Sequence, residues 1–191
     1  MTKQEKSQAA TGSMFVTEAY LPAKLSDNNN TVLARYNAYS DFFEINTPQE
    51  GKVQTVTKDP SVTITFVGTK KTYAYVNYKT GKGDAESGYL NVLAAGPKAK
   101  FYKRERIILQ PEVFPNNSYQ TYKPASYKKA DDEFYVSLNN GETVILENKK
   151  DLAKLAPSKS KEILDYIKTN KIDLEKEQDL VKLGQYLETI L

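Results

Sequence analysis

Apolar and polar positions alternate along most of the chain between residues 14 and 147, which is the period of a strand with one buried face. The clearest example is the run of residues 61–67, in which Val62, Ile64 and Phe66 share one face and threonines separate them. Such runs, divided by short turn segments, predict an antiparallel sheet. The predicted strands are residues 14–21, 31–37, 42–45, 52–57, 61–67, 70–79, 89–94, 100–109, 134–138 and 143–146.

Turn residues join several of these strands. Gly96 and Pro97 follow residues 89–94, and Asn139-Asn140-Gly141 follows residues 134–138, so each pair of flanking strands is predicted to form a hairpin. Residues 110–127 contain three prolines and no strand pattern, and they predict an irregular excursion.

After Glu147 the apolar spacing changes to three and four residues, which is the period of a helix. A short helix is expected to end at Pro157, a second to start at a Ser158 cap and end near Asn170, and a third to start at about Glu175. Their apolar stripes are Leu152 and Leu155; Ile163, Leu164 and Ile167; and Leu180, Leu183, Leu187 and Ile190. Helices this short are marginal alone in water, so we expect them to cover a sheet face or an open sheet end.

The predicted fold class is therefore α+β: an antiparallel sheet of roughly ten short strands, in the form of a roll or a partly open barrel or sandwich, followed by two or three C-terminal α-helices. Residues 14–191 are expected to form a single domain, β-rich over 14–147 and helical over 148–191. Residues 1–13 are polar and predict a disordered N-terminal arm. No apolar run approaches the about 20 residues of a membrane-spanning helix, so no transmembrane segment is expected.

Composition excludes several kinds of chemistry. The chain has no cysteine and no histidine, which removes disulfides, thiolate nucleophiles, histidine-based catalytic triads and zinc sites built from these ligands. No phosphate-binding loop, nucleophile elbow or calcium loop is present. We therefore expect a non-enzymatic protein and assign no catalytic residue, cofactor or metal.

Two polar and aromatic segments are candidates for binding a partner. The predicted turn after residues 31–37 carries Arg35, Tyr36 and Tyr39, although the same tyrosines could simply pack across the turn. The basic run at residues 98–106 places Tyr102, Arg104 and Arg106 on one strand face.

That strand face fits a nucleic acid or an anionic glycan in its chemistry, because aromatic rings stack and arginines neutralise charge. However, the formal net charge is only +3, from 27 basic and 24 acidic residues, whereas phosphate-backbone binders are strongly basic. We therefore favour a solvated face whose arginines pair with neighbouring carboxylates, and we predict no nucleic-acid partner.

The chain also resembles a group of small exported proteins of unknown function from Bacteroidota, especially flavobacteria. The resemblance covers most of residues 14–191, and it lies in the segments 35–41, 88–93, 102–104, 161–172 and 177–183. It implies export through a cleaved signal peptide that this chain does not contain, and a place in the periplasm or outer envelope. The group has no assigned activity, so the resemblance implies a location and no mechanism.

These observations favour a non-enzymatic envelope protein, an accessory or structural subunit that acts through a protein partner. One alternative is a ligand-binding β-barrel or β-roll with Tyr73, Tyr75 and Tyr78 inside a cavity. Another is a carboxylate-dependent hydrolase, which requires two acids distant in sequence to face each other across a cleft. Oligomeric state does not follow from the sequence.

Overall fold

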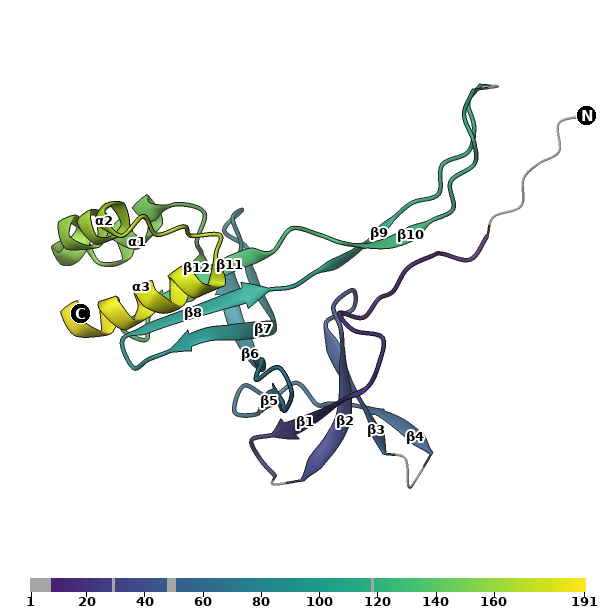
Figure 1. The fold of residues 1–191 in the computed structure, drawn as a ribbon, viewed down its shortest axis with the longest axis horizontal. Helices are drawn as coiled ribbons and strands as arrows, with labels where there is room; N and C mark the ends of the chain where they lie inside the picture. Colours follow the sequence, from purple (N-terminus) through teal and green to yellow (C-terminus); the bar gives the residue numbers. More distant parts are fainter. Residues whose placement is uncertain (1–7, 29, 48–50, 118) are drawn as a thin grey trace, which may run out of the picture.

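The computed structural model describes residues 8–28, 30–47, 51–117 and 119–191. It contains twelve strands followed by three α-helices and one short 3-10 helix (Figure 1). The strands are β1 (Leu21–Leu25), β2 (Thr31–Asn37), β3 (Phe42–Thr47), β4 (Lys52–Thr55), β5 (Thr63–Phe66), β6 (Thr72–Lys79), β7 (Ala85–Ala95), β8 (Ala99–Arg104), β9 (Ile107–Gln110), β10 (Ser126–Lys129), β11 (Glu133–Leu138) and β12 (Val144–Ile145). The helices are α1 (Lys149–Leu155), η1 (Pro157–Lys159), α2 (Ser160–Thr169) and α3 (Glu177–Ile190).

Ten strands form one sheet in the order β12-β11-β8-β7-β6-β5-β1-β2-β3-β4. Nearly all neighbours are antiparallel, but β12 also pairs in parallel with β6, through Val144 and Lys79. Strands β6, β7, β8, β11 and β12 therefore close on themselves, while β5 and β1–β4 continue the sheet as an open extension. The predicted α+β class, with a partly closed barrel and C-terminal helices, is confirmed.

Three groups of buried side chains fill this architecture. The barrel interior holds Tyr78, Leu90, Tyr102 and Tyr135. The open extension folds over a second, aromatic cluster, Tyr36, Phe43, Ile64, Phe66, Tyr73 and Tyr89 among its members. The third cluster lies between the helices and the outer face of β8 and β11, and it contains Phe101, Val136, Leu152, Ile163, Leu180, Leu183 and Leu187.

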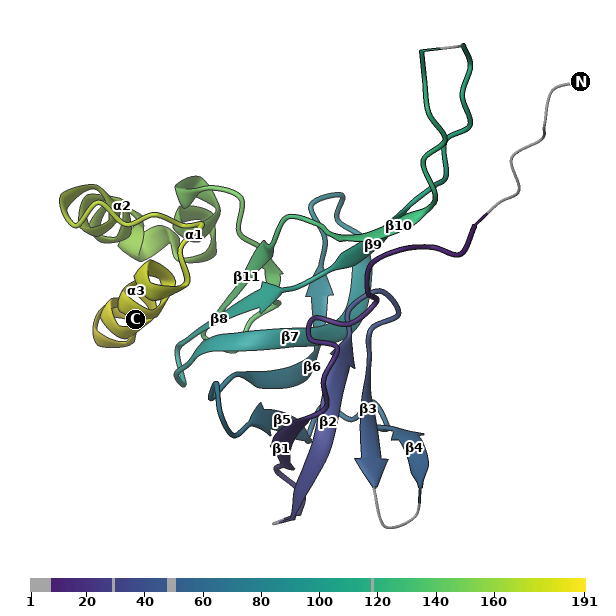
Figure 2. The same cartoon turned by 45° about the vertical axis from the view of Figure 1, so that its right-hand side comes forward.

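The helices lie together at one side of the sheet, with α3 along β7 and β8 (Figures 1 and 2). Helix α1 begins with a capping box, in which the Asn148 side chain accepts from the Lys150 N–H and the Asp151 side chain accepts from the Asn148 N–H. The predicted Asn170 C-cap is confirmed. The predicted Ser158 cap is wrong, because Ser158 lies in the 3-10 turn and α2 starts after Lys159. No helix within the described ranges has the length and apolar content needed to cross a bilayer.

The first predicted strand, residues 14–21, is corrected. This segment is irregular apart from one bridge between Phe15 and Asn37, and β1 starts only at Leu21. Pro22 lies inside β1, where its carbonyl accepts from Val67 N–H. The position where Pro22 lacks an N–H also faces β5, but it lies beyond Ala23–Phe66, the last residue pair between β1 and β5. The β1–β5 ladder therefore loses no hydrogen bond.

The predicted strand 100–109 divides into β8 and β9, and β9 leaves the sheet to pair with β10, which the sequence did not predict. Together with the loop between them, β9 and β10 form a hairpin of residues 107–129 that projects from the body (Figures 1 and 2). We call this hairpin the arm. Beyond β9 and β10, Val113 and Lys123 pair through hydrogen bonds in both directions.

The predicted disorder of residues 1–13 is corrected in part. Thr11 forms a parallel bridge with Ser126 and exchanges backbone hydrogen bonds with Ala125 and Tyr127, so residues 8–12 run along β10. Residues 1–7 lie outside the described part of the chain.

Candidate functional site

A groove of about 360 Å³ lies at the root of the arm, and it joins the two segments that the sequence singled out. The Ile107 N–H donates to the Ala38 carbonyl at 3.2 Å and holds these segments together. Four of the six predicted partner-binding residues line the groove. Its lining is Tyr36, Ala38, Tyr39, Asp41, Arg104, Glu105, Arg106, Ile107, Ile108 and Leu109.

The β2–β3 turn builds one wall of the groove. The buried Asn37 side chain accepts from the N–H groups of Tyr39 and Ser40, and this hydrogen bonding forms the turn. Asp41 has a positive φ of 55° and accepts from the Tyr36 hydroxyl at 2.8 Å. The turn therefore buries Tyr36 and leaves Tyr39 44% exposed.

Burial and the neighbouring Asp41 carboxylate both raise the pKa of Tyr36 well above its usual value. Its hydroxyl consequently stays protonated and serves as a hydrogen-bond donor to Asp41. Since Asp41 also accepts from the Tyr89 N–H at 3.0 Å and pairs with Lys58 at 2.9 Å, its oxygens are already engaged within the chain. This wall is a structural support for the groove.

The two arginines of the other wall are paired with carboxylates. Arg104 lies 3.3 Å from both Glu86 and Glu133, and its guanidinium carbon lies 5.2 Å from the centre of the Tyr78 ring. Arg106 contacts Glu133 at 2.7 Å, while its Nε is buried with no partner among the described residues. The predicted pairing of these arginines with neighbouring carboxylates agrees with these contacts. The predicted solvated face is corrected, because Tyr102 is buried in the barrel and the Arg104 side chain is only 25% exposed.

The two remaining candidate residues lie elsewhere. Tyr102 is 9% exposed and fills the barrel interior. Arg35 donates to Glu44 at 2.8 Å and stacks on the rings of Phe15 and Tyr20. Of the six residues, therefore, only Tyr39 and Arg106 combine a place in the groove with an exposed side chain.

A cluster of charges with a buried centre lies behind the groove, between β8 and α3: Lys103 and Glu105 are buried, while Lys71 and Glu177 at its edges are partly exposed. Glu105 accepts from Tyr73 and pairs with Lys71 at 2.8 Å and with Lys103 at 3.3 Å. Lys103 also contacts Glu177, at the start of α3, at 2.5 Å. We call Lys71, Tyr73, Lys103, Glu105 and Glu177 the buried charge cluster.

Both central members of this cluster remain ionised. Burial opposes the charge of Glu105, but hydrogen bonds and attraction from Lys71, Tyr73 and Lys103 outweigh it and lower its pKa. Burial likewise opposes the charge of Lys103, but its carboxylate neighbours outweigh it and raise its pKa. General acid–base catalysis needs a pKa shifted toward neutrality, and these shifts run the other way. The cluster fastens α3 to the sheet.

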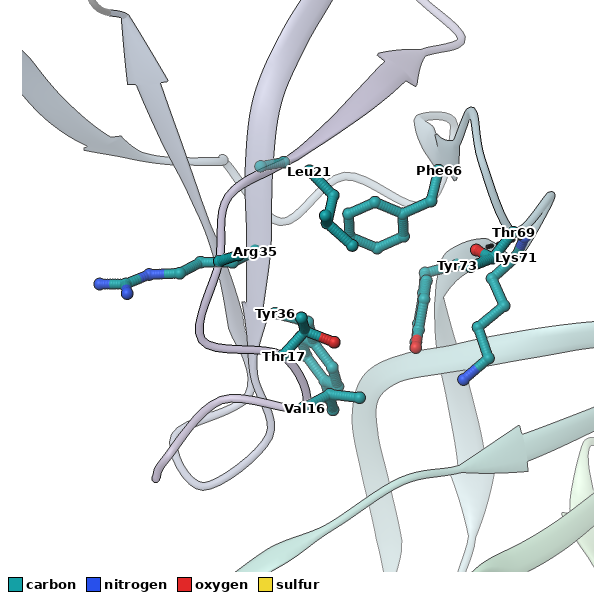
Figure 3. A pocket seen from close by; sticks show the side chains of 11 residues that line it. Val16, Thr17, Leu21, Arg35, Tyr36, Phe66, Thr69, Lys71 and Tyr73 are labelled. Carbon is teal, nitrogen blue, oxygen red and sulfur yellow. Dashed lines mark hydrogen bonds between the residues drawn. The ribbon is translucent and has the colours of Figure 1, made fainter. Parts of the chain in front are cut away.

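A second hollow, of about 100 Å³, lies on the other side of Tyr36, beneath the irregular segment 16–19 (Figure 3). Leu21, Phe66 and Tyr73 line it, while the Arg35 guanidinium points away. Small-molecule sites usually measure about 300–1,000 Å³, so this hollow admits no more than a small apolar fragment.

The three tyrosines predicted to line one cavity are separated by the sheet. Tyr73 and Tyr75 pack in the aromatic cluster of the open extension, whereas Tyr78 lies in the barrel interior. Tyr78 packs against Tyr135 with the two rings tilted and their centres 4.7 Å apart. Burial raises the pKa of Tyr135 to about 12, so this hydroxyl too stays protonated.

Acidic residues gather in an open hollow of about 470 Å³ beside β11, lined in part by Asp131, Asp132, Glu133, Glu147 and Glu175. Asp132 pairs with Lys129 at 3.1 Å, and Glu133 pairs with Arg106. Across the described ranges, no three acidic residues are placed to hold a metal ion together.

The arm carries apolar side chains that the sequence analysis did not select. Ile108 is 42% exposed, Val113 50% and Phe114 45%, and Tyr119 is almost fully exposed. The sequence does contain a signal for this surface. These apolar residues lie in a segment rich in proline and asparagine, which predicts a loop, and loops are normally polar.

No protein-family model, no curated protein and no solved structure matches this chain. The site is therefore interpreted from its own geometry.

Proposed function

We propose that this protein is a non-enzymatic, exported accessory or structural subunit of the cell envelope that acts through protein–protein contacts. The contact surface is the arm together with the groove at its root. The observation that carries this proposal is the row of exposed apolar side chains along a projecting hairpin. Exposed apolar patches on folded proteins mark interaction sites, and a two-stranded hairpin gains stability when it is covered.

The chemistry of the groove supports a contact surface over a catalytic one. Tyr39 and Arg106 belong to residue types that are frequent among the residues dominating interface energetics. The Glu105 carboxylate and the Lys103 amine next to the groove have pKa values displaced away from neutrality. The location in the envelope rests on the resemblance to exported Bacteroidota proteins.

The test is affinity purification of the tagged chain, with a native signal sequence, from detergent-solubilised membranes of the source organism. Three baits are compared: the unchanged chain, Phe114→Asp in the arm, and Val53→Asp at another exposed apolar site, on β4. We expect a stoichiometric envelope protein with the first and third baits and its loss with the second. The same yield with all three baits, or no partner with any, would refute the proposal.

A further inference from the structure

The outer edge of β9 carries backbone groups that have no partner. The Ala130 N–H donates to the Arg106 carbonyl, so every second residue counted from Arg106 turns its backbone groups toward β10. The residues between them, Ile107 and Leu109, turn theirs to the outside. There the Ile107 N–H meets the Ala38 carbonyl, but the Leu109 N–H and the carbonyls of Ile107 and Leu109 bond to no other described residue. These groups are the template for a further strand.

The opposite edge of the same hairpin already holds an extended segment. Tyr127, directly across from Leu109, donates its N–H outward to the Thr11 carbonyl at 2.8 Å. The Thr11 N–H in turn donates to the Ala125 carbonyl at 2.9 Å, so residues 8–12 cover the edge of β10. Strand β9 presents the same kind of edge, and beyond its first residue no segment of the described chain covers it.

The groove at the root of the arm lies along this uncovered edge. Ile108 and Leu109 of β9 line it together with Tyr39 of the β2–β3 turn, and the three side chains are 42%, 39% and 44% exposed. In a strand added to β9, every second side chain would point to this apolar rim. The Ile107–Ala38 hydrogen bond closes the groove at one end, so the added strand would run from Leu109 toward the tip of the arm.

The charges that line the groove leave one cation with unused donors. Asp41 pairs with Lys58, Glu105 with two lysines, and Arg104 with two glutamates, so these three residues are already engaged. Arg106 contacts only Glu133, and its side chain is 36% exposed. Since a guanidinium has five N–H donors, Arg106 can accommodate a second carboxylate.

The arm itself adds positive charge along the same edge. Residues 107–129 contain three lysines and one glutamate, and this glutamate, Glu112, accepts from the Tyr122 hydroxyl at 2.8 Å. Lys123 and Lys128 pair with no carboxylate of the described chain. A segment that carries Asp or Glu therefore meets unpaired cations as it approaches β9.

We propose that an extended, acidic segment of a protein partner lies in the groove and adds to β9 as a further strand. The inference rests on the contact surface of the proposed function and names the chemistry of its occupant. The Leu109 N–H donates to a carbonyl of the segment, and the carbonyls of Ile107 and Leu109 accept from its N–H groups. Apolar side chains of the segment contact Tyr39 and Ile108, and an Asp or Glu contacts Arg106.

An extended segment fits this surface better than the other occupants. A helix uses its backbone groups internally and would leave the edge of β9 without partners. A second copy of this chain would bring another arm with the same unpaired lysines, and like charges would face each other.

The experiment is a selection of random peptides displayed on phage against the immobilised full chain, after which the enriched peptides are synthesised as fluorescent probes. We expect enriched peptides in which apolar residues alternate with Asp or Glu. The dissociation constant of such a probe should rise about tenfold in Leu109→Pro, which removes the outward N–H. Proline is tolerated at this position because the N–H of an edge residue faces away from the ladder.

The matched control is Val53→Pro on β4, the edge strand of the large sheet. The Val56 N–H donates to the Phe43 carbonyl, so the register turns the Val53 N–H outward as well. Val53→Pro should leave the dissociation constant unchanged. No enriched peptide, or equal affinity of the Leu109→Pro and Val53→Pro variants, would overturn the inference.

Amide hydrogen exchange followed by NMR tests the pairing in the unchanged chain. The Leu109 amide should exchange at least about tenfold more slowly when the probe is bound, because it gains a hydrogen bond. The Ile107 amide, already bonded to Ala38, should change little. A Leu109 exchange rate that the probe does not alter would overturn the strand addition.

The acidic chemistry is tested with Arg106→Gln. This variant should bind the acidic probe about fivefold more weakly, and it should bind a probe with amides in place of its carboxylates as the unchanged chain does. Equal losses for both probes would overturn the role of the carboxylates.

A fourth bait, Leu109→Pro, is added to the envelope purification to separate this inference from the proposed function. A partner that is lost with Phe114→Asp but kept with Leu109→Pro would refute the strand addition and leave the proposed function standing. Peptide binding as described, with no envelope protein captured by the unchanged chain, would refute only the accessory-subunit role.

Discussion

The buried charge cluster and the arm differ in how their polar and apolar groups find partners. Lys103 is 4% exposed, yet it contacts Glu105, Glu177 and, at 3.8 Å, Asp132. Lys123 lies in solvent, and no described carboxylate pairs with it. Apolar groups show the same contrast, because Leu183 on α3 is fully buried whereas Val113 on the arm is half exposed.

This contrast separates structural roles from contact roles. Charges that are buried and fully partnered hold elements together and have little left to offer a ligand. Exposed apolar residues on a projecting element remain available to another molecule. Within this protein, the pKa shifts of Lys103 and Glu105 therefore reflect the fastening of α3, and the candidate contact surface is found through exposed apolar side chains.

The largest effect is expected from removing the central charge of the cluster. Lys103→Ala leaves Glu105 and Glu177 facing each other with one cation fewer, and it should lower the free energy of unfolding by about 3–5 kcal/mol. Denaturant titration followed by circular dichroism measures this change. The matched control is Lys128→Ala, an exposed lysine of β10, which should stay within about 0.5 kcal/mol. If Lys103→Ala and Lys128→Ala lowered the free energy of unfolding by the same amount, the charges of the cluster would stabilise the fold no more than those of the arm.

A smaller effect is expected where α3 touches the sheet. A Cβ on Gly184 would lie 3.0 Å from the Cβ of Ala94 and 3.4 Å from the Phe101 ring, so a larger side chain forces the helix away. Gly184→Val should destabilise the chain by about 1–3 kcal/mol. Gln185→Val, one position further along α3 on its exposed side, controls for the helix propensity of valine. A neutral Gly184→Val variant would contradict the close packing.

Acid should weaken the cluster before it affects the arm. Because the pKa of Glu105 is lowered on folding, its contribution is present above the unfolded pKa of about 4.3 and is lost as pH falls through the lower folded value. Unfolding free energy should therefore decrease between about pH 5 and pH 3, and less steeply in Glu105→Gln. Glu142→Gln, in an exposed pair with Lys79, should leave the slope unchanged. Identical slopes in all three proteins would contradict the shift.

The smallest effect on folding is expected from shortening the arm. Val113 and Lys123 exchange hydrogen bonds of 2.8 and 2.9 Å, so residues 114–122 can be replaced by Asn-Gly in a two-residue turn. Without a bound partner, the free energy of unfolding should change by less than about 1 kcal/mol. A cooperative loss of the body fold, seen in the same titration, would show that the arm belongs to the core.

Local patterns predicted the elements whose faces are evenly buried. Strand β2 begins and ends where its alternation does, and the leucines of α3 are buried as their spacing indicated. Asn139 and Asn140 take positive φ angles of 52° and 56° in the predicted tight turn. In β2 and α3, a single spacing of apolar residues matches the pattern of buried side chains along the whole element.

The prediction of strands failed where one continuous run of residues passes from the sheet into a different environment. The run of residues 100–109 contains no turn residue, but Glu105 turns into the buried charge cluster, and the chain leaves the sheet after Arg104. Strand β10 contains only Ser, Tyr and Lys, and its pairing depends on β9. Neither event has a local signal, because both depend on residues far away in the chain.

The candidate site shows the same division. The sequence singled out the segments around Tyr39 and Arg106 as rich in interface-type residues, but it could not show that the Ile107–Ala38 hydrogen bond joins them in one groove. Nor could the sequence show that Tyr36 is buried while Tyr39 is exposed, because this difference depends on how the turn orients the two side chains.

By itself, the sequence determined the α+β class, the helical stripes and the turn at Asn139, because these depend on side-chain period and local backbone preference. Tertiary structure alone decided the closure of β12 onto β6, the burial of Lys103 among carboxylates and the exposure of the arm. Each of these arises from groups brought together over long sequence distances, where the free energy of a charge or an apolar side chain depends on what surrounds it.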